Sequence, residues 1–159
     1  MKNILIKKAD TADSNIITEY LKKMLLDMSE YGGYPVSSSD KNWSEISETI
    51  KSNINNENHI FILVVEKEKS KIIAFGEAKI FDINPVFELI KQIHISAIFV
   101  ENEYRKKGIG KLIVNELIRI GKERGCHEAE LNVILNNPAY FLYKKIGFKE
   151  FRVNMRKKI

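Results

Sequence analysis

The order of hydrophobic patterns along this 159-residue chain predicts an α/β (α+β) fold, with helices packed on a central sheet. Segments whose apolar residues recur every three or four positions alternate with short runs rich in β-branched residues. The composition, 44% hydrophobic and 30% charged, excludes a wholly disordered, collagen-like or membrane-spanning chain. No repeat or Pro/Gly-rich linker divides residues 1–159, so we expect a single domain.

The first half of the chain predicts two helices and three strands. Apolar stripes mark the helices, and a charged turn at residues 67–70 joins the last two strands into a hairpin. In order, the elements are a strand at 3–9, a helix from about 13 that ends at Gly32, a helix at 43–54, and strands at 60–66 and 71–81.

The second half continues the alternation. Residues 82–91 form a longer connection with Pro85, which is expected to line a binding site or an oligomer contact. Asn137 and Pro138 stand where a helix cap and first turn are expected. The elements are a strand at 93–100, a helix at 108–124, a strand at 129–134, a short helix after 138 that ends at Gly147, and one or two strands within 148–159.

The charge is distributed unevenly. The net charge is +5, but residues 1–100 carry 12 Lys and 14 acidic residues, whereas residues 101–159 carry 14 basic and 7 acidic residues. The positive charge is therefore local, and an anion site belongs in the second part. Cys126 is the only cysteine, so we expect no disulfide and no thiolate-bound metal. The start has too short an apolar run for a signal peptide, which predicts a cytoplasmic protein with no membrane partner.

Residues 95–111 are the segment most indicative of function. A predicted strand runs into a basic loop with Gly108 and Gly110, and the loop becomes a helix N-terminus. Free N–H groups, the helix dipole and nearby lysines there favour a phosphate. A Walker A loop is excluded because one residue, not four, separates the glycines, and a Rossmann fingerprint lacks its third glycine at Ile113. The basic residues cluster at one loop, which favours a compact phosphate ligand over nucleic acid.

The run Arg105-Lys106-Lys107-Gly108-Ile109-Gly110 resembles the Q/R-x-x-G-x-G/A signature of the GNAT superfamily of acyl-CoA-dependent N-acetyltransferases. Residues 136–148 resemble the family's N-x-x-A-x-x-x-Y-x-x-x-G-F segment, at the family's distance downstream. The resemblance implies a mixed, mostly antiparallel sheet of six to seven strands with about four helices. It also implies that the sheet opens between the strands at 93–100 and 129–134, where the thioester of acetyl-CoA lies.

The resemblance assigns roles to particular residues. Strand backbone pairs with the pantetheine arm, loop and helix N–H groups hold the pyrophosphate, and Asn136 reaches the cofactor. The implied cofactor-binding residues are Ile98, Phe99, Val100, Arg105, Lys106, Lys107, Gly108, Ile109, Gly110, Lys111 and Asn136. Tyr143 corresponds to the tyrosine that acts as general acid, and a phenol held against the sulfur can protonate the leaving thiolate.

The sequence offers several candidates for the general base. Gln92, His94 and Ser96 alternate with apolar residues and are expected to share one strand face, and histone-type members of the family place a base near His94. Glu77 and Glu101 are secondary candidates. In members that act on a ribosomal protein, a catalytic Glu lies on the following strand. The matching position here is Leu131, with Glu130 one residue away and on the other face.

The predicted function is acetyl transfer from acetyl-CoA to a primary amine by direct attack in a ternary complex. We expect a small cationic amine, because acids and aromatics flank the first interhelical loop and suit a cation. These residues are Asp27, Glu30, Tyr31, Tyr34 and Trp43. The alternatives are a protein or peptide amine as acceptor and, in another class, a CoA-binding sensor without turnover. Members of the family often form dimers, so a homodimer is possible.

Overall fold

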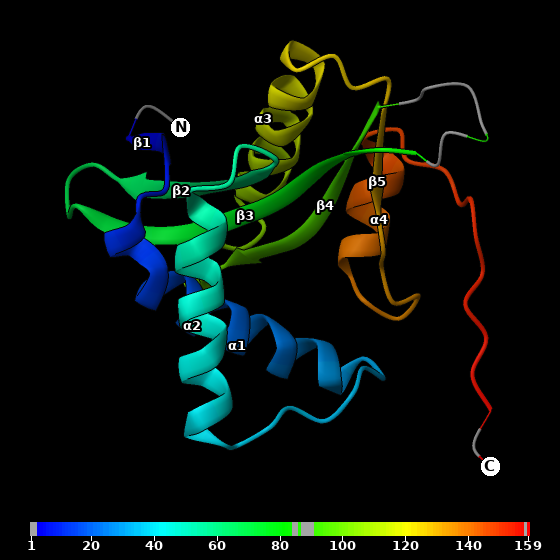
Figure 1. Ribbon diagram of the computed structural model, residues 1–159, viewed down its shortest axis with the longest axis horizontal. Coiled ribbons are helices and arrows are strands. Elements are labelled where there is room, and N and C mark those ends of the chain that lie inside the picture. The colour runs from blue at the N-terminus through cyan, green and yellow to red at the C-terminus, as the bar shows by residue number, and fades with distance from the viewer. Residues whose placement is uncertain (1–2, 84–85, 87–90, 158) are drawn as a thin grey trace.

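The computed structural model describes residues 3–83, 86, 91–157 and 159 (Figure 1). Two single-turn helices, η1 (Thr11–Asp13) and η2 (Asn102–Tyr104), accompany the main elements. These are β1 (Ile4–Lys8), α1 (Ser14–Glu30), α2 (Asp40–Ile54), β2 (His59–Glu66), β3 (Lys71–Asp82), β4 (Lys91–Val100), α3 (Ile109–Glu123), β5 (Glu128–Leu131) and α4 (Ala139–Lys145). The alternation predicted from the sequence is confirmed. Most of the connection at 82–91, including Pro85, lies outside the described residues.

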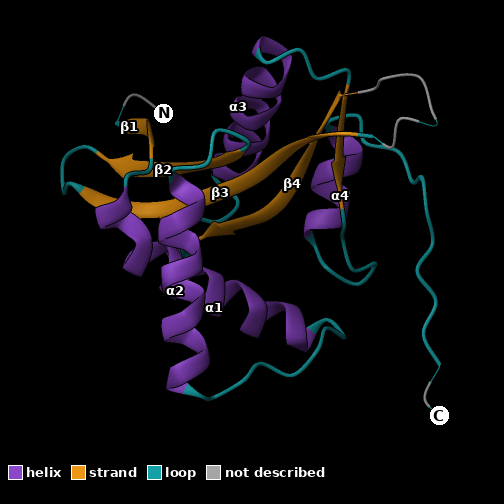
Figure 2. Ribbon diagram, in the orientation of Figure 1, coloured by secondary structure: helices purple, strands orange, loops and turns teal. Residues whose placement is uncertain are grey.

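The described residues form one five-stranded sheet in the order β1-β2-β3-β4-β5 (Figure 2). The pairs β1/β2, β2/β3 and β3/β4 are antiparallel, whereas β5 runs parallel to β4. The mixed, mostly antiparallel sheet is therefore confirmed, with fewer strands than the six to seven predicted. The charged turn at 67–70 joins β2 to β3 as a hairpin, as expected.

The helices cover the two faces of this sheet. α1 and α2 lie on one face, where Ile17, Tyr20 and Ile50 pack against Phe61 and Phe75. On the opposite face, α3 packs against the sheet through Ile109, Ile113, Val114 and Leu117, which lie three or four residues apart. The stripe predicted for this helix is therefore buried, and each face of the sheet has its own apolar layer.

A bulge in β4 changes which side chains face α1. Glu77 pairs with Ala97 and Ala78 pairs with Ile95, so Ser96 is the extra residue on β4. Up to Ile95 the strand alternates as predicted, with His94 on the face of α1 and α2. Beyond the bulge, Ala97 packs with α1, whereas simple alternation would have directed it toward α3.

The last strands predicted from the sequence are absent from the described residues. Residues 149–157 have no regular secondary structure, and β5 ends at Leu131, three residues before the predicted end. The tail instead runs along the outside of the molecule (Figure 1). Phe151, Val153 and Met155 alternate with polar residues as in a strand, but a strand also needs a neighbour to pair with its backbone groups.

The helix ends follow their local sequence signals. Gly32 and Gly147 adopt positive φ angles of 96° and 102° just after α1 and α4, where a left-handed residue closes a helix. Before α4, the Asn137 side chain accepts a 2.9 Å hydrogen bond from the N–H of Ala139. Among the described residues, no helix is long and apolar enough to cross a membrane.

Candidate active site

The loop between β4 and α3 presents unpaired backbone donors. Lys106 and Gly108 have φ angles of 60° and 82°, and Gly108 is the N-cap of α3. The backbone N–H groups of residues 106–111 have no acceptor among the described residues. Left-handed loop residues followed by a helix N-terminus direct such N–H groups toward one point, which suits a phosphate.

The side chains of the loop divide into two groups. Lys106, Lys107 and Lys111 are exposed and surround the free N–H groups with positive charge. Arg105 instead points toward α1: its guanidinium lies 2.5 Å from the Asp27 carboxylate, and its Nε donates a 2.9 Å hydrogen bond to the Val100 carbonyl. The loop therefore keeps three exposed cations, of which Lys107 lies 5.3 Å from the centre of the Tyr104 ring, while Arg105 joins the loop to the first helix.

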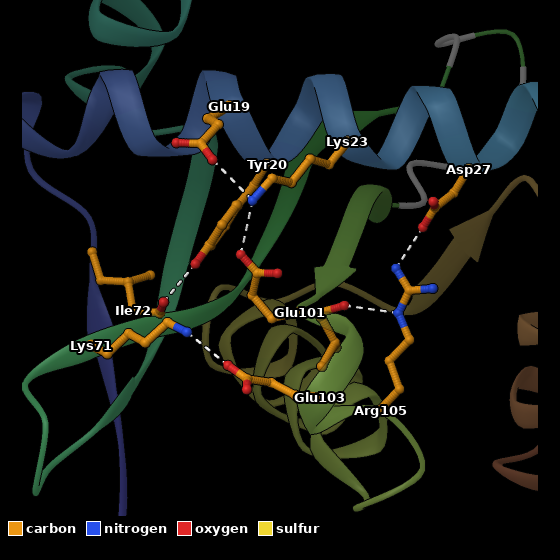
Figure 3. A network of polar contacts seen from close by, with 10 residues as sticks. Glu19, Tyr20, Lys23, Asp27, Lys71, Ile72, Glu101, Glu103 and Arg105 are labelled. Atoms are coloured by element: carbon orange, nitrogen blue, oxygen red, sulfur yellow. Dashed lines mark hydrogen bonds and ion pairs between the residues drawn. The ribbon is translucent and has the colours of Figure 1, made fainter.

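Further contacts strengthen this junction (Figure 3). Lys23 lies 3.0 Å from Glu101 and 2.9 Å from Glu19, and the Tyr20 hydroxyl donates to the Ile72 carbonyl. Burial, together with the nearby Glu101 carboxylate, raises the pKa of Tyr20 to about 12, so its phenol stays protonated. α1 and the loop are thus joined through two ion pairs, on both sides of a hollow that is lined by Leu26 and Phe99.

Beside the loop, the end of β4 has an open edge. Pairing with β5 stops at Ile95 and Leu131, but β4 continues to Val100. The Glu101 N–H donates to Ile73 on the β3 side, so the alternation of a strand leaves the N–H groups of Ile98 and Val100 on the open side. An extended ligand with amide groups can pair with this edge as a strand would.

Tyr143 lies on α4, on the face of the sheet covered by α3. Its ring packs against the α3-side core, 6.0 Å from the ring of Phe148. α4 lies close to the start of α3, as shown by the 3.2 Å that would separate a Cβ on Gly110 from the Leu142 Cδ2. Burial raises the pKa of Tyr143, which keeps the phenol protonated and able to donate.

His94 lies on the opposite face, next to an acidic side chain. Its Nδ1 is 3.5 Å from the Glu130 Oε1, and both side chains are about one quarter exposed, at 24% and 26%. They are register partners on β4 and β5, and so are Gln92 and Glu128. Gln92 Nε2 lies 3.4 Å from a carboxylate oxygen of each glutamate.

Glu77 lies on this same face, across from Ala97 and beside the bulge. It has no hydrogen-bond or ion-pair partner among the described residues, and burial raises its pKa. A carboxyl group in such surroundings binds a proton more readily than an exposed carboxyl group does. It is therefore a second proton acceptor within the face that His94 occupies.

The family model described as the acetyltransferase (GNAT) family matches residues 24–148. The chain belongs to the GNAT family of acetyltransferases. Enzymes of this family use acetyl-CoA as the acetyl donor. The matched range includes the open β4 edge, the loop and α4, so the resemblance seen in the sequence motifs is confirmed.

Known proteins that share this GNAT domain agree with the assignment. A 67-residue segment is 40% identical to an N-alpha-acetyltransferase of Sulfurisphaera tokodaii, covering 41% of this chain and 40% of that protein. The BH1408 protein of Bacillus halodurans has the same fold, with a TM-score of 0.82 at 22% identity over 98% of this chain and 99% of that one. A predicted acetyltransferase of Clostridium acetobutylicum, solved with acetyl-CoA, gives a TM-score of 0.79 at 22% identity over 98% and 96%.

Other residues expected in the GNAT site have local partners or are exposed. Asn136 is exposed in the turn before α4, whereas its neighbour Asn137 caps that helix. Trp43 is buried and donates its indole N–H to the Ser37 carbonyl, 2.9 Å away. The Asp27 carboxylate pairs with Arg105.

Two features of the site were not predicted from the sequence. The pairing of His94 with Glu130 depends on the register of β4 against β5, which the alternation of residues 92–96 does not reveal. The link between Asp27 and Arg105 joins residues 78 positions apart. The charge of each residue was visible in the sequence, but nothing local indicated its partner.

Proposed function

We propose that this protein transfers the acetyl group of acetyl-CoA to the amine of a small cationic molecule. The observation that supports this most directly is the open β4 edge, which runs straight into a loop whose N–H groups at 106–111 have no acceptor among the described residues. A ligand with an amide-containing arm and a diphosphate matches both parts. Acetyl-CoA has both, and acyl-CoA is the donor on which the family acts.

The donor site uses backbone more than side chains. Ile98 and Val100 offer N–H groups for the pantetheine amides, while the N-terminus of α3 and three lysines receive the diphosphate. The thioester then lies where β4 and β5 separate, beyond Ile95 and Leu131. A strand N–H at this opening can stabilise the oxyanion that forms during attack.

The acid and the base approach this opening from opposite faces. Tyr143, on the α3 side, donates its proton to the leaving CoA thiolate. His94, oriented by Glu130, takes the proton from the attacking amine, directly or through a water molecule. Glu77, on the same face, is the alternative base, because its raised pKa favours accepting a proton. The amine loses its proton on one side while the sulfur gains one on the other.

The acceptor face carries more acidic than basic groups. Glu77 projects from β3, and Glu128 and Glu130 project from β5, on either side of β4; Lys79 is a basic side chain paired across from His94. Carboxylates at this spacing favour an ammonium group that arrives charged and is then deprotonated. We therefore place the amine of a polyamine, amino sugar or amino-acid-like molecule here.

A peptide amine is the second candidate. The relative from Sulfurisphaera tokodaii is named an N-alpha-acetyltransferase, and another match, from Haemophilus influenzae, is named a ribosomal-protein alanine N-acetyltransferase. These matches cover 40% and 36% of the relatives' lengths, so their acceptors are candidates to test. An acceptor panel should therefore include short peptides with free N-termini.

The test is a thiol-release assay with acetyl-CoA across polyamines, amino sugars, amino acids and peptides. We expect at least one small amine to give turnover above hydrolysis. Tyr143→Phe should then lower kcat by about 100-fold and leave CoA binding unchanged, because general acids contribute at least about this factor. The matched control is Tyr140→Phe on the same helix, which removes a hydroxyl that donates a hydrogen bond to the Glu150 carboxylate beyond the helix.

Two results would contradict the proposal. Equal kcat values for Tyr143→Phe and the wild type would show that Tyr143 is not the general acid. Binding of CoA without turnover on any amine in the panel would instead favour a CoA sensor.

A further inference from the structure

We propose that the Lys79 ammonium group binds an anionic group of the acceptor, so that the preferred acceptor is a primary amine with a carboxylate or phosphate several bonds away. The inference rests on the proposed acetyl transfer and narrows its acceptor. The reactive ammonium group remains the cationic part, but an amino-acid-like or phosphorylated amine fits, and a polyamine does not. A row of polar side chains across the sheet carries the inference, together with the charges along that row.

Four polar side chains form this row on one face of the sheet. Lys79 on β3 is paired with His59 on β2 and with His94 on β4. His94 is paired in turn with Glu130 on β5. Register partners project from the same face with their Cβ atoms about 5 Å apart. The neighbours of these residues along β3, β4 and β5 pack in the α3-side core, so the row lies on the face of α1 and α2.

α1 and α2 leave the row open. Their apolar contacts with the sheet are made by residues such as Phe61, Phe75 and Phe99, which lie farther along the strands than the row. Lys79 is exposed, and His94 lies next to the point where β4 and β5 separate. A small molecule whose amine reaches this opening therefore also reaches the row.

The row is negative on one side and positive on the other. Over β5, Glu130 lies beside His94, and Glu128 is the next residue on the same face. Over β3, Lys79 supplies a positive charge, and the His59 ring is its neighbour on β2. A molecule that lies across the strands, with its ammonium group near His94, thus has its other end over Lys79. An anionic group at that end is favoured by charge.

The Lys79 ammonium group has no carboxylate partner in the described part of the chain. Lys71, on the same strand, lies 2.7 Å from Glu103 and is paired. Glu77 is two residues from Lys79 on the same face, but burial raises its pKa and no ion pair with Lys79 offsets this. A lysine that lies on the acceptor face without a partner keeps its charge available to a ligand.

His59 provides a second unpaired group beside Lys79. Its Nδ1 is buried and has no hydrogen-bond partner among the described residues. Burial lowers the pKa of His59, and the nearby Lys79 ammonium group lowers it further, so the ring is neutral at pH 7. A buried polar atom without a partner costs free energy. An anionic oxygen bound at Lys79 can accept a hydrogen bond from this ring when Nδ1 carries the proton.

The spacing of the strands sets the length of the acceptor. The reactive amine lies at the opening between β4 and β5, and Lys79 lies on β3, so one to two strand spacings, roughly 5–10 Å, separate them. The α-amine and carboxylate of an amino acid are too close together to span this distance. About three to five methylene groups between amine and anion span it. ω-Amino acids, and amino acids with a terminal side-chain amine, have this spacing.

The test compares acceptors that differ only in the group distal to the amine. Alkylamines, ω-amino acids, aminoalkyl phosphates and diamines of matched chain length are assayed by thiol release with acetyl-CoA. We expect the wild type to favour one anionic series over the alkylamines by about tenfold in kcat/KM, mainly through a lower KM, because hydrogen bonds to charged groups contribute roughly this factor. The preferred series identifies carboxylate or phosphate. The preference should be largest at about three to five methylene groups and small for glycine.

Variants at Lys79 connect the preference to this side chain. Lys79→Gln should abolish the preference for the anionic acceptor. Lys79→Glu should reverse it, so that the diamine of the same length becomes the better acceptor, which loss of structure alone would not produce. The matched control is Lys122→Gln, which changes an exposed lysine on α3, on the opposite face of the sheet, and should retain the wild-type preference.

The possible failures can be told apart. Equal use of anionic acceptors and alkylamines by the wild type, or an unchanged preference in Lys79→Gln, would overturn the inference and leave acetyl transfer intact. Loss of the preference in Lys122→Gln as well would assign it to overall surface charge and not to Lys79. Absence of turnover with every amine would overturn acetyl transfer itself, and the inference with it.

Discussion

The Glu77 carboxyl lies on β3 beside the bulge of β4, and burial raises its pKa. An acid whose folded-state pKa is raised binds a proton more tightly when folded than when unfolded. Its protonated form contributes stability fully below the unfolded-state pKa, and that contribution is lost as pH rises through the folded-state pKa. Glu77 therefore costs stability near neutral pH, and a residue kept at such a cost is a candidate for chemistry.

Replacing this carboxyl with an amide tests the cost directly. Glu77→Gln should be more stable than the wild type at pH 7, and the difference should shrink toward zero at pH 4, where the wild-type carboxyl is protonated. Melting temperatures at both pH values measure this. Glu128→Gln, an exposed carboxyl on the neighbouring sheet edge, is the control. A Glu77→Gln variant that is less stable at pH 7 would show that ionised Glu77 has a stabilising partner.

At the scale of elements, the packing of α3 on β3 depends on one missing side chain. A Cβ on Gly76 would lie 2.4 Å from the Ile113 Cγ2, far inside normal contact, and Ile113 is fully buried. Gly76→Ala should therefore push α3 away from the sheet and lower the free energy of unfolding by about 1–3 kcal/mol. Chemical denaturation measures this. Gly110→Ala should cost less, because its nearest neighbour is the end of the Leu142 side chain at 3.2 Å. Equal losses of unfolding free energy in the two variants would mean that the packing of α3 on β3 adjusts to the added methyl group.

The junction between α1 and the phosphate loop gives a second prediction at this scale. Asp27 holds Arg105, and Arg105 in turn hydrogen-bonds the Val100 carbonyl at the open β4 edge. Asp27→Asn should release the guanidinium and loosen this edge. Because partly exposed ion pairs are worth about 0–1 kcal/mol, we expect the KM for acetyl-CoA to rise by up to about fivefold with kcat less affected.

Steady-state kinetics with varied acetyl-CoA measures this change. The control is Glu103→Gln, which breaks the exposed ion pair with Lys71 near the same loop. A rise in KM of the same size in both variants would show that only general surface charge matters, and not the support of Arg105 by α1.

For the whole molecule, the sequence predicted what depends on local pattern. The stripes of α1, α2 and α3, the hairpin of β2 and β3, and the Asn137 cap were all visible in short windows. The bulge at Ser96 and the pairing of His94 with Glu130 depend on register between strands, which no single window contains. The strands expected within 148–159 are absent from the described residues, where the tail has no neighbouring strand to pair with its backbone groups.

The uneven distribution of charge gives a prediction for the molecule in solution. The lysines around the α3 N-terminus attract the phosphates of CoA, while the β4 edge recognises the neutral arm, so salt should weaken the first interaction and spare the second. CoA at about 100 times its Kd should stabilise the protein by about 2.7 kcal/mol at low salt. At about 1 M NaCl, where the screening length falls to about 3 Å, the shift in melting temperature should shrink markedly. Pantetheine, which has no phosphate, is the control and should give a smaller shift that salt leaves unchanged. A CoA shift that is independent of salt would place the binding energy on the arm alone, and the positive charge of residues 101–159 would then serve another role.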